Sequence, residues 1–164
     1  MSKHQIATIF SVMRTLKSIN PGDQYYEAYL GHLRKHGDDF YDLYMLLWEL
    51  GSERAPKRVL EVGTRTGISL CQLLSAYLSD PLPERIVCVD PMDDGFLSPN
   101  LVRANLQHLG LPSDKVEFMQ EKSDGALSRL IDDGSKFDYI LIDGDHEKSV
   151  ARNDLANEHK IIQP

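Results

Sequence analysis

The residues best suited to chemistry lie in one turn, in which Glu61 is followed by Gly63, Thr66, Gly67 and Ser69. A short apolar run ends at the acid, and a helical pattern begins just after the second glycine. This order predicts a strand, a tight turn and the N-terminus of a helix. A ligand can touch the backbone of such a turn because glycine has no Cβ atom. The free N–H groups at the start of the helix favour a carboxylate or a phosphate.

Polar side chains also follow the other three apolar runs that we expect to be strands. Asp90 follows the second run, Ser123 and Asp124 follow the third, and Asp143 and His146 follow the fourth. Because ligands of parallel sheets bind at the carboxyl ends of the strands, we expect these side chains to converge there. Asp90 could accept hydrogen bonds from both hydroxyls of a ribose, since a carboxylate has two acceptor oxygens.

The rest of the chain supplies the elements that would position these residues. We expect strands at 58–61, 85–89, 116–119 and 139–142, and helices near 67–79, 98–109, 123–132 and 146–158. This alternation is typical of an α/β fold with a Rossmann-like, doubly wound and mostly parallel sheet, here with strand order 3-2-1-4. Apolar side chains at helical spacing over 2–19 and 23–50 predict N-terminal helices. We therefore expect a helical cap over 1–57, with a linker from 52 to 57, and a Rossmann-like domain over 58–164.

Composition and charge argue against several other classes of protein. The chain has 164 residues, a net charge of −7 and no basic run, so nucleic acid is not expected as a partner. No apolar stretch is long enough to span a membrane, and the first residues lack the apolar core of a signal peptide. Cys71 and Cys88 do not have the spacing of a zinc site. We interpret them as buried, reduced thiols and expect a cytoplasmic protein.

Two classes of cofactor fit an acid at the position of Asp90. A dinucleotide site typically has a glycine two residues after Gly63, where this chain has Arg65. Glu61 would also repel a pyrophosphate, whereas it suits a ligand that carries an ammonium group. S-adenosylmethionine carries an ammonium group, a sulfonium and a ribose, so it fits better. An NAD-dependent enzyme stays open as the less favoured interpretation.

Four segments, in order, resemble a known family. Residues 59–69 resemble motif I of the class I S-adenosylmethionine-dependent methyltransferases, in the variant found in small-molecule O-methyltransferases, and residues 87–91 resemble motif II. Ser123-Asp124 resembles the adenine-side motif, and residues 137–146 resemble motif IV of the macrocin O-methyltransferase-like group. The resemblance covers roughly residues 58–164. It implies transfer of a methyl group to an oxygen of a small molecule.

The resemblance also implies roles for individual residues. Those implied to bind S-adenosylmethionine are Glu61, Gly63, Thr64, Arg65, Thr66, Gly67, Ser69, Asp90, Pro91, Met92, Ser123, Asp124 and Asp143. Asp143 and His146 are implied to be catalytic, with His146 as a base whose ordinary pKa suits proton removal near neutral pH. In metal-dependent relatives an acid at the position of Asp143 binds a divalent ion, so the resemblance extends to Mg²⁺. Asp143 could instead cap the next helix, and His146 could be a surface histidine.

The end of the chain raises a further expectation. Residues 139–142 form a continuous apolar run, which is typical of a strand covered on both sides. Strand order 3-2-1-4 would leave this strand at an apolar edge, and such edges favour association. We expect either a fragment of a larger protein, cut before a fifth strand that supplies further metal ligands in relatives, or a homo-oligomer that covers the edge. A non-catalytic S-adenosylmethionine-binding module or an inactive fragment is therefore the alternative function.

Overall fold

The computed structural model describes residues 46–47, 50–77, 82–93, 97–111, 113–144 and 147–163. The predicted helix at 2–19, nearly all of that at 23–50, and His146 lie outside these residues, so the predicted cap over 1–57 stays a prediction. Residues 50–54 are helical, so the prediction of a linker beginning at 52 was wrong. Tertiary packing explains the difference: a Cβ atom on the buried Gly51 would lie 2.9 Å from Cβ of Ala76.

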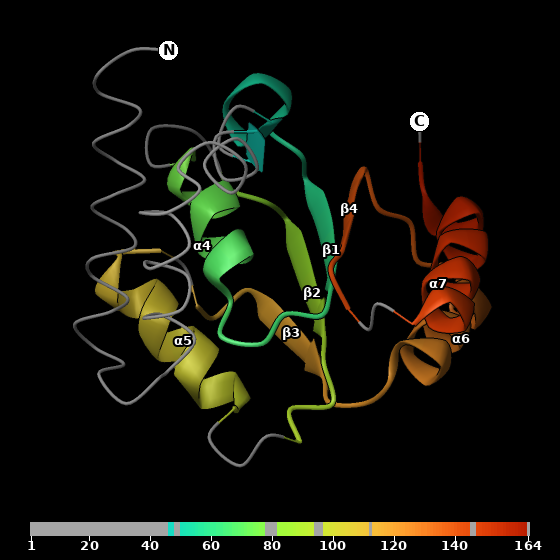
Figure 1. Cartoon of the computed structure of the whole chain (residues 1–164). Coiled ribbons are helices and arrows are strands. Elements are labelled where there is room, and N and C mark those ends of the chain that lie inside the picture. The colour runs from blue at the N-terminus through green and yellow to red at the C-terminus, as the bar shows by residue number, and fades with distance from the viewer. Residues whose placement is uncertain are drawn as a thin grey trace, which may run out of the picture.

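In the described part of the chain, four parallel strands form a sheet: β1 (Arg58–Val62), β2 (Arg85–Val89), β3 (Val116–Met119) and β4 (Tyr139–Ile142). The order is β3-β2-β1-β4, with β1 hydrogen-bonded to β2 and to β4 (Figure 1). In this register Val59 pairs with Ile86 on one side and with Tyr139 on the other. The predicted α/β, Rossmann-like fold and its strand order are therefore confirmed, and β1 extends one residue beyond its predicted end.

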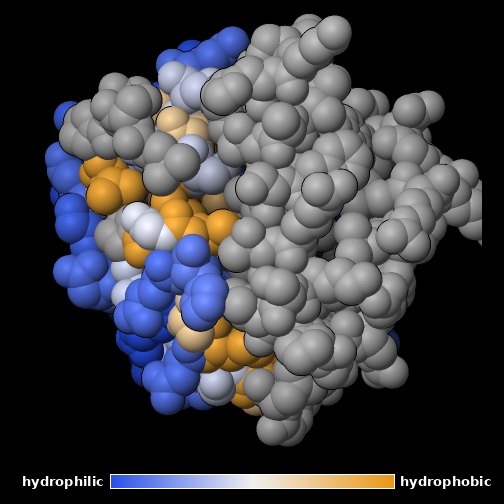
Figure 2. Space-filling view, turned by 90° about the vertical axis from the view of Figure 1, so that its left-hand side faces the viewer, coloured by the Kyte–Doolittle hydropathy of each residue, from blue (hydrophilic) through white to orange (hydrophobic). Residues whose placement is uncertain are grey.

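Helices cover both faces of the sheet. α4 (Ile68–Ser75) and α5 (Pro99–His108) lie on one side, and α6 (Ser123–Asp132) and α7 (Lys148–Ile161) lie on the other (Figure 1). Because successive side chains of a strand point to opposite faces, β1 contributes Val59 to one hydrophobic core and Leu60 and Val62 to the other. On the side of α4 and α5, hydrophobic atoms also reach the surface between hydrophilic ones (Figure 2). The four helices expected between and after the strands are confirmed.

The helices of the first core begin in different ways. At α5 the hydroxyl of Ser98 accepts the N–H of Leu101 at 3.2 Å, and Pro99 takes the first helical position. This is the capping arrangement that those two residue types favour. At α4 the cap is Gly67, which is left-handed (φ 77°) and provides no capping side chain. The turn before α4 therefore presents backbone rather than a side chain at the start of the helix.

β4 lies at one edge of this sheet, and its four residues are half-buried. After α7 the chain returns to this edge, where Ile162 forms an isolated parallel bridge with Phe137. The N–H of Phe137 donates to the carbonyl of Ile161 at 2.9 Å, and the N–H of Gln163 donates to the carbonyl of Phe137 at 2.8 Å. Association of two copies through the β4 edge stays a prediction.

Both cysteines are buried free thiols, as the sequence predicts. Burial is the main cause that raises the pKa of Cys71 and of Cys88, and the nearby Glu61 adds to both effects. Neither thiol is therefore activated as a nucleophile. As to membranes, none of the helices among the described residues combines the length and apolar character that a bilayer span requires.

Candidate functional site

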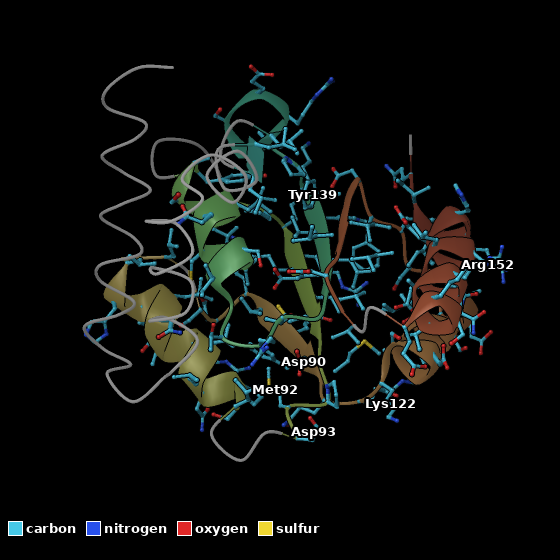
Figure 3. The ribbon with its side chains drawn as sticks, in the orientation of Figure 1. Asp90, Met92, Asp93, Lys122, Tyr139 and Arg152 are labelled. Carbon is cyan, nitrogen blue, oxygen red and sulfur yellow. The ribbon has the colours of Figure 1, made fainter. Side chains whose placement is uncertain are left out.

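A cavity of about 480 Å³ opens at the carboxyl ends of the strands. Asp90, Met92, Asp93 and Lys122 lie toward this end of the sheet, whereas Tyr139 lies toward the opposite end (Figure 3). Such a volume suits a small organic ligand. The wall is formed by Val62, Gly63, Arg65, Val89, Asp90, Pro91, Asp93, Leu97, Glu121, Lys122, Ser123, Asp124, Asp143, Gly144 and Val150.

Gly63 brings the turns after β1 and β4 into contact. Its backbone is left-handed (φ 88°), and its N–H donates to the carbonyl of Val89 at 2.8 Å. A Cβ atom at this position would overlap the carbonyl group of Asp143 and would lie 2.6 Å from Cα of Gly144. These neighbours are backbone atoms, which cannot rotate out of the way. Glycine is therefore required here by both the backbone angle and the available space.

Replacement of Gly63 by alanine is expected to lower the free energy of unfolding by roughly 3 kcal/mol, from backbone strain and overpacking together. Gly134→Ala is the matched control, because Gly134 is also left-handed (φ 73°) but a Cβ atom there would meet nothing within 4 Å. Its loss is expected to be about 1 kcal/mol. Urea denaturation of both variants measures the difference. Equal losses of the free energy of unfolding would show that overlap with Asp143 adds nothing to the cost of the left-handed backbone.

The carboxylate of Asp90 ties together the turns after β1 and β2. Oδ2 accepts the N–H of Arg65 at 2.7 Å, and Oδ1 accepts the N–H of Met92 at 2.8 Å. Both donors have left-handed backbone, with φ 48° at Arg65 and 51° at Met92. This conformation costs a residue other than glycine about 1–2 kcal/mol, so the two charge-assisted bonds offset strain at the cavity wall. Each oxygen can still accept another hydrogen bond.

Glu61 lies behind the same turn and is only 1% exposed. Neither carboxyl oxygen has a hydrogen-bond partner among the described residues, and neither does the buried hydroxyl of Thr64. Burial raises the pKa of Glu61 from 4.5 to about 8, and the charges of Asp143 and Asp90 add to the rise, while the nearby hydroxyls of Ser69 and Thr64 oppose it. The side chain is therefore mostly protonated and neutral at pH 7.

The start of α6 forms another part of the wall. Lys122 is the N-cap but makes no side-chain capping bond, and Asp124 lies in the first turn, where the helix dipole stabilises a negative charge. Glu121, on the same wall, forms an ion pair with Arg129 of α6. This arrangement places polar side chains and the positive end of a helix on the same cavity as the turn after β1.

Among the described residues, the wall carries more negative than positive side chains. Its cations are Arg65 and Lys122, and its acids are Asp90, Asp93, Glu121, Asp124 and Asp143. An excess of one sign in a cavity attracts a ligand of the other sign. The cavity is therefore better suited to a ligand with a cationic group than to one that carries several phosphates.

The structure brings some of the predicted site residues to the cavity and keeps others behind it. Those on the wall are Gly63, Arg65, Asp90, Pro91, Ser123, Asp124 and Asp143. Those not on the wall are Glu61, Thr64, Thr66, Gly67, Ser69 and Met92. Met92 was predicted to bind the cofactor, but its side chain is 8% exposed and belongs to the core under α4 and α5. The roles of all these residues as ligand contacts stay predictions.

Several wall residues were missed from the sequence. Asp93 is exposed, and it also faces the cavity. Its position three residues after Asp90 was the signal that could have found it. Lys122 immediately precedes Ser123 and could have been found in the same way. Val150 gave no signal, because its place on the wall depends on how α7 packs.

The described residues do not complete the predicted magnesium site. Across the described part of the chain, no group of three or more His, Cys, Asp or Glu side chains could hold a metal ion. Asp143 is exposed on the wall, and a hard divalent ion needs several oxygen ligands. Magnesium as a second cofactor therefore stays a prediction.

The parallel sheet with a ligand-sized cavity at its carboxyl edge places this chain in the class of Rossmann-like α/β proteins. Residues 60–164 match the model of a family described as a methyltransferase domain. The chain belongs to this methyltransferase family, as the motifs predict. No curated protein matches the sequence.

Solved structures of methyltransferases are similar to the chain. An O-methyltransferase from Bacillus cereus, in complex with S-adenosylhomocysteine, has 20% identity and a TM-score of 0.64, over 94% of this chain and 62% of that one. The O-methyltransferase TomG from Streptomyces achromogenes, involved in tomaymycin synthesis and solved with S-adenosylmethionine, has 25% identity and a TM-score of 0.58, over 73% and 50%. A SAM-dependent methyltransferase from Agrobacterium tumefaciens has 17% identity and a TM-score of 0.57, over 74% and 41%. The chain thus spans less than two thirds of the length of each.

Proposed function

We propose that this protein is an S-adenosylmethionine-dependent methyltransferase that methylates an oxygen of a small molecule. The observation that carries the proposal is the cavity that joins the turn at Gly63, the carboxylate of Asp90 and the start of α6. Membership of the methyltransferase family supports it. So do the complexes of the Bacillus cereus and Streptomyces achromogenes proteins with S-adenosylhomocysteine and S-adenosylmethionine.

The three parts of the cofactor would be bound by three parts of the site. The turn from Gly63 to Gly67, with Ser69 and the start of α4, which no side chain caps, would hold the amino-acid part, whose carboxylate suits a helix N-terminus. Asp90 would accept the ribose hydroxyls. Pro91, Ser123 and Asp124 would border the adenine. A bound ammonium group would favour the ionised form of Glu61, and that carboxylate would then attract it from behind the turn, where burial strengthens the attraction of unlike charges.

Bound S-adenosylmethionine supplies an electrophilic methyl group on a sulfonium sulfur. The protein would hold the acceptor oxygen in line with that methyl group, and positioning of this kind supplies most of the rate of such a displacement. Asp143 lies on the wall at the end of β4 and would lie beside the reacting groups. His146, which follows three residues later, would take the proton of the acceptor hydroxyl.

Titration calorimetry with S-adenosylmethionine and S-adenosylhomocysteine tests the cofactor. Both are expected to bind with dissociation constants in roughly the micromolar range, as is usual for enzyme ligands. Absence of heat with either ligand, on protein shown to be folded, would end the cofactor proposal. Tight binding of NADH, seen as a change of its fluorescence, would favour the dinucleotide alternative instead.

A methyl-transfer assay with phenols and sugars separates an enzyme from a non-catalytic S-adenosylmethionine-binding module. Radiolabelled methyl transfer that is lost in Asp143→Ala would support the enzyme. Binding without transfer across a broad panel would favour the module, for which the short span relative to the solved methyltransferases is the motivation.

We propose a cytoplasmic protein with a small-molecule acceptor, without nucleic acid or membrane as a partner.

A further inference from the structure

We infer that Asn105 of α5 is a positioning residue, which fixes the turn after β1 and thereby the amino-acid part of the bound cofactor. The inference rests on the proposed function for the identity of the ligand. It assigns a role to a residue outside the cavity wall, on a helix that no motif of the site includes.

The contact between Asn105 and the turn is direct. The side-chain amide Nδ2 of Asn105 donates to the carbonyl oxygen of Thr66 at 2.9 Å. Asn105 is 1% exposed and Thr66 is 6% exposed, so the bond is shielded from water. A buried carbonyl that loses its donor is costly, since water cannot replace it. Asn105 therefore favours the orientation of the Thr66–Gly67 peptide in which that carbonyl points toward α5.

The neighbouring Val102, one turn earlier on α5, packs against Gly67 of the same peptide. A Cβ atom on Gly67 would lie 2.7 Å from Cγ1 of Val102. Van der Waals contact limits how far the turn can move toward α5, but it does not select which way a peptide faces. Two directional bonds on opposite sides of the peptide make that selection together: the one from Asn105 to the carbonyl of Thr66 at 2.9 Å, and the one from the N–H of Gly67 to the carbonyl of Thr64 at 2.7 Å.

The orientation of this peptide matters because α4 begins immediately after it. Gly67 is the cap of α4, its N–H donates to the carbonyl of Thr64 at 2.7 Å, and its own carbonyl accepts the N–H of Cys71 at 2.8 Å. If the Thr66–Gly67 peptide rotates, these bonds and the first N–H groups of α4 change direction together. The affinity for a ligand that needs the native turn then falls in proportion to the fraction of molecules that retain it.

A role in positioning predicts a selective effect on two related ligands. S-adenosylhomocysteine has an amino-acid part, whereas 5′-methylthioadenosine keeps the adenosine and the sulfur but lacks that part. Asn105→Leu preserves approximate volume and removes the donor. It is expected to weaken binding of S-adenosylhomocysteine about tenfold, as expected if about a tenth of the molecules retain the native turn. Binding of 5′-methylthioadenosine is expected to stay within about twofold of wild type, because the N–H of Met92 still holds Asp90 even where the bond from the N–H of Arg65 is lost.

The control is Gln107→Ala on the same helix, because Nε2 of Gln107 donates to Ser113 rather than to the turn. This variant should bind both ligands like wild type. Calorimetry with each ligand, and thermal unfolding of each protein, provide the measurements. If Asn105→Leu does not fold, Asn105→Ser, which removes the amide with less apolar burial, takes its place.

The outcomes are separable. Selective loss of S-adenosylhomocysteine binding supports the inference. Equal loss of both ligands, or loss of neither, overturns it, since a merely structural asparagine would not distinguish them. Failure of wild-type protein to bind either ligand would instead contradict the proposed function.

Discussion

Asp90→Asn is expected to raise the dissociation constant for S-adenosylmethionine about 100-fold. The change keeps the shape of the side chain but removes the charge and places an amide NH₂ where an oxygen accepts a hydrogen bond. Loss of hydrogen bonds to a charged group costs about 1.5–3 kcal/mol each, and 1.4 kcal/mol corresponds to a tenfold change in affinity. Because Asp90 also accepts the N–H groups of Arg65 and Met92, the free energy of unfolding is expected to fall by roughly 2 kcal/mol as well.

Two further variants separate binding from stability at Asp90. Asp93→Asn removes an exposed acid from the same wall, so its expected effect on affinity is only about threefold. Arg65→Gly added to Asp90→Asn relieves the left-handed strain at position 65 and should recover part of the lost stability without recovering affinity. Calorimetry and urea denaturation provide the two measurements. Affinity of Asp90→Asn within about threefold of wild type would show that Asp90 only supports the turns.

Glu61→Gln is expected to make the free protein more stable at pH 8 while it weakens S-adenosylmethionine binding. The pKa of Glu61 is raised from 4.5 to about 8, so the folded state holds a proton that the unfolded state has released. Retention of this proton contributes to the free energy of unfolding. The contribution is fully present below pH 4.5 and is lost as the pH rises through about 8. Glutamine does not titrate, so the advantage of the variant should grow across this window to a few kcal/mol, about 10 °C in melting temperature.

The ligand responds to the same proton in the opposite sense. A cationic ammonium group near Glu61 favours the carboxylate, so binding should release a proton from wild type at pH 6.5 and none from this site in Glu61→Gln. Calorimetry in two buffers with different ionisation enthalpies counts the protons released. The ratio of wild-type to variant affinity should rise with pH up to about 8. A ratio that stays constant would mean that Glu61 does not sense the ligand.

The fold was predictable because it depends on patterns that are local in the sequence. The apolar run at 139–142 and the run that ends at Glu61 indicate strands, of which β1 is largely buried and the edge strand β4 is half-buried. The alternation of strands with helices then restricts the topology to a few parallel arrangements. The linker assigned from 52 onward was wrong because residues 50–54 are helical, and Gly51 packs so closely that a Cβ atom there would lie 2.9 Å from Cβ of Ala76. Such close packing against a distant residue cannot be inferred from the polar sequence of residues 52–57.

The site was predictable only to the extent that single residues at strand ends define it. Asp90 and Gly63 could be placed at the carboxyl edge because each follows a strand directly. The hydrogen bonds of Asp90 to two backbone N–H groups could not be predicted, because they depend on how two separate turns approach each other. The same reason hid Val150 on the wall and Asn105 behind it. Met92 was assigned from a motif position, whereas the structure buries its side chain.

The position of β1 between β2 and β4 has a consequence for synthesis of the protein on the ribosome. The N–H of Arg58, at the start of β1, donates to the carboxylate of Asp138, which is 80 residues later. At translation rates of about 5–20 residues per second, β4 is synthesised roughly 4–16 s after β1, so β1 lacks its second neighbouring strand for that time. Throughout that interval Asp143, whose backbone carbonyl lies against Gly63, has not yet been synthesised. We therefore expect a nascent chain that is stalled before β4 to be unable to retain the cofactor, however complete its first motif.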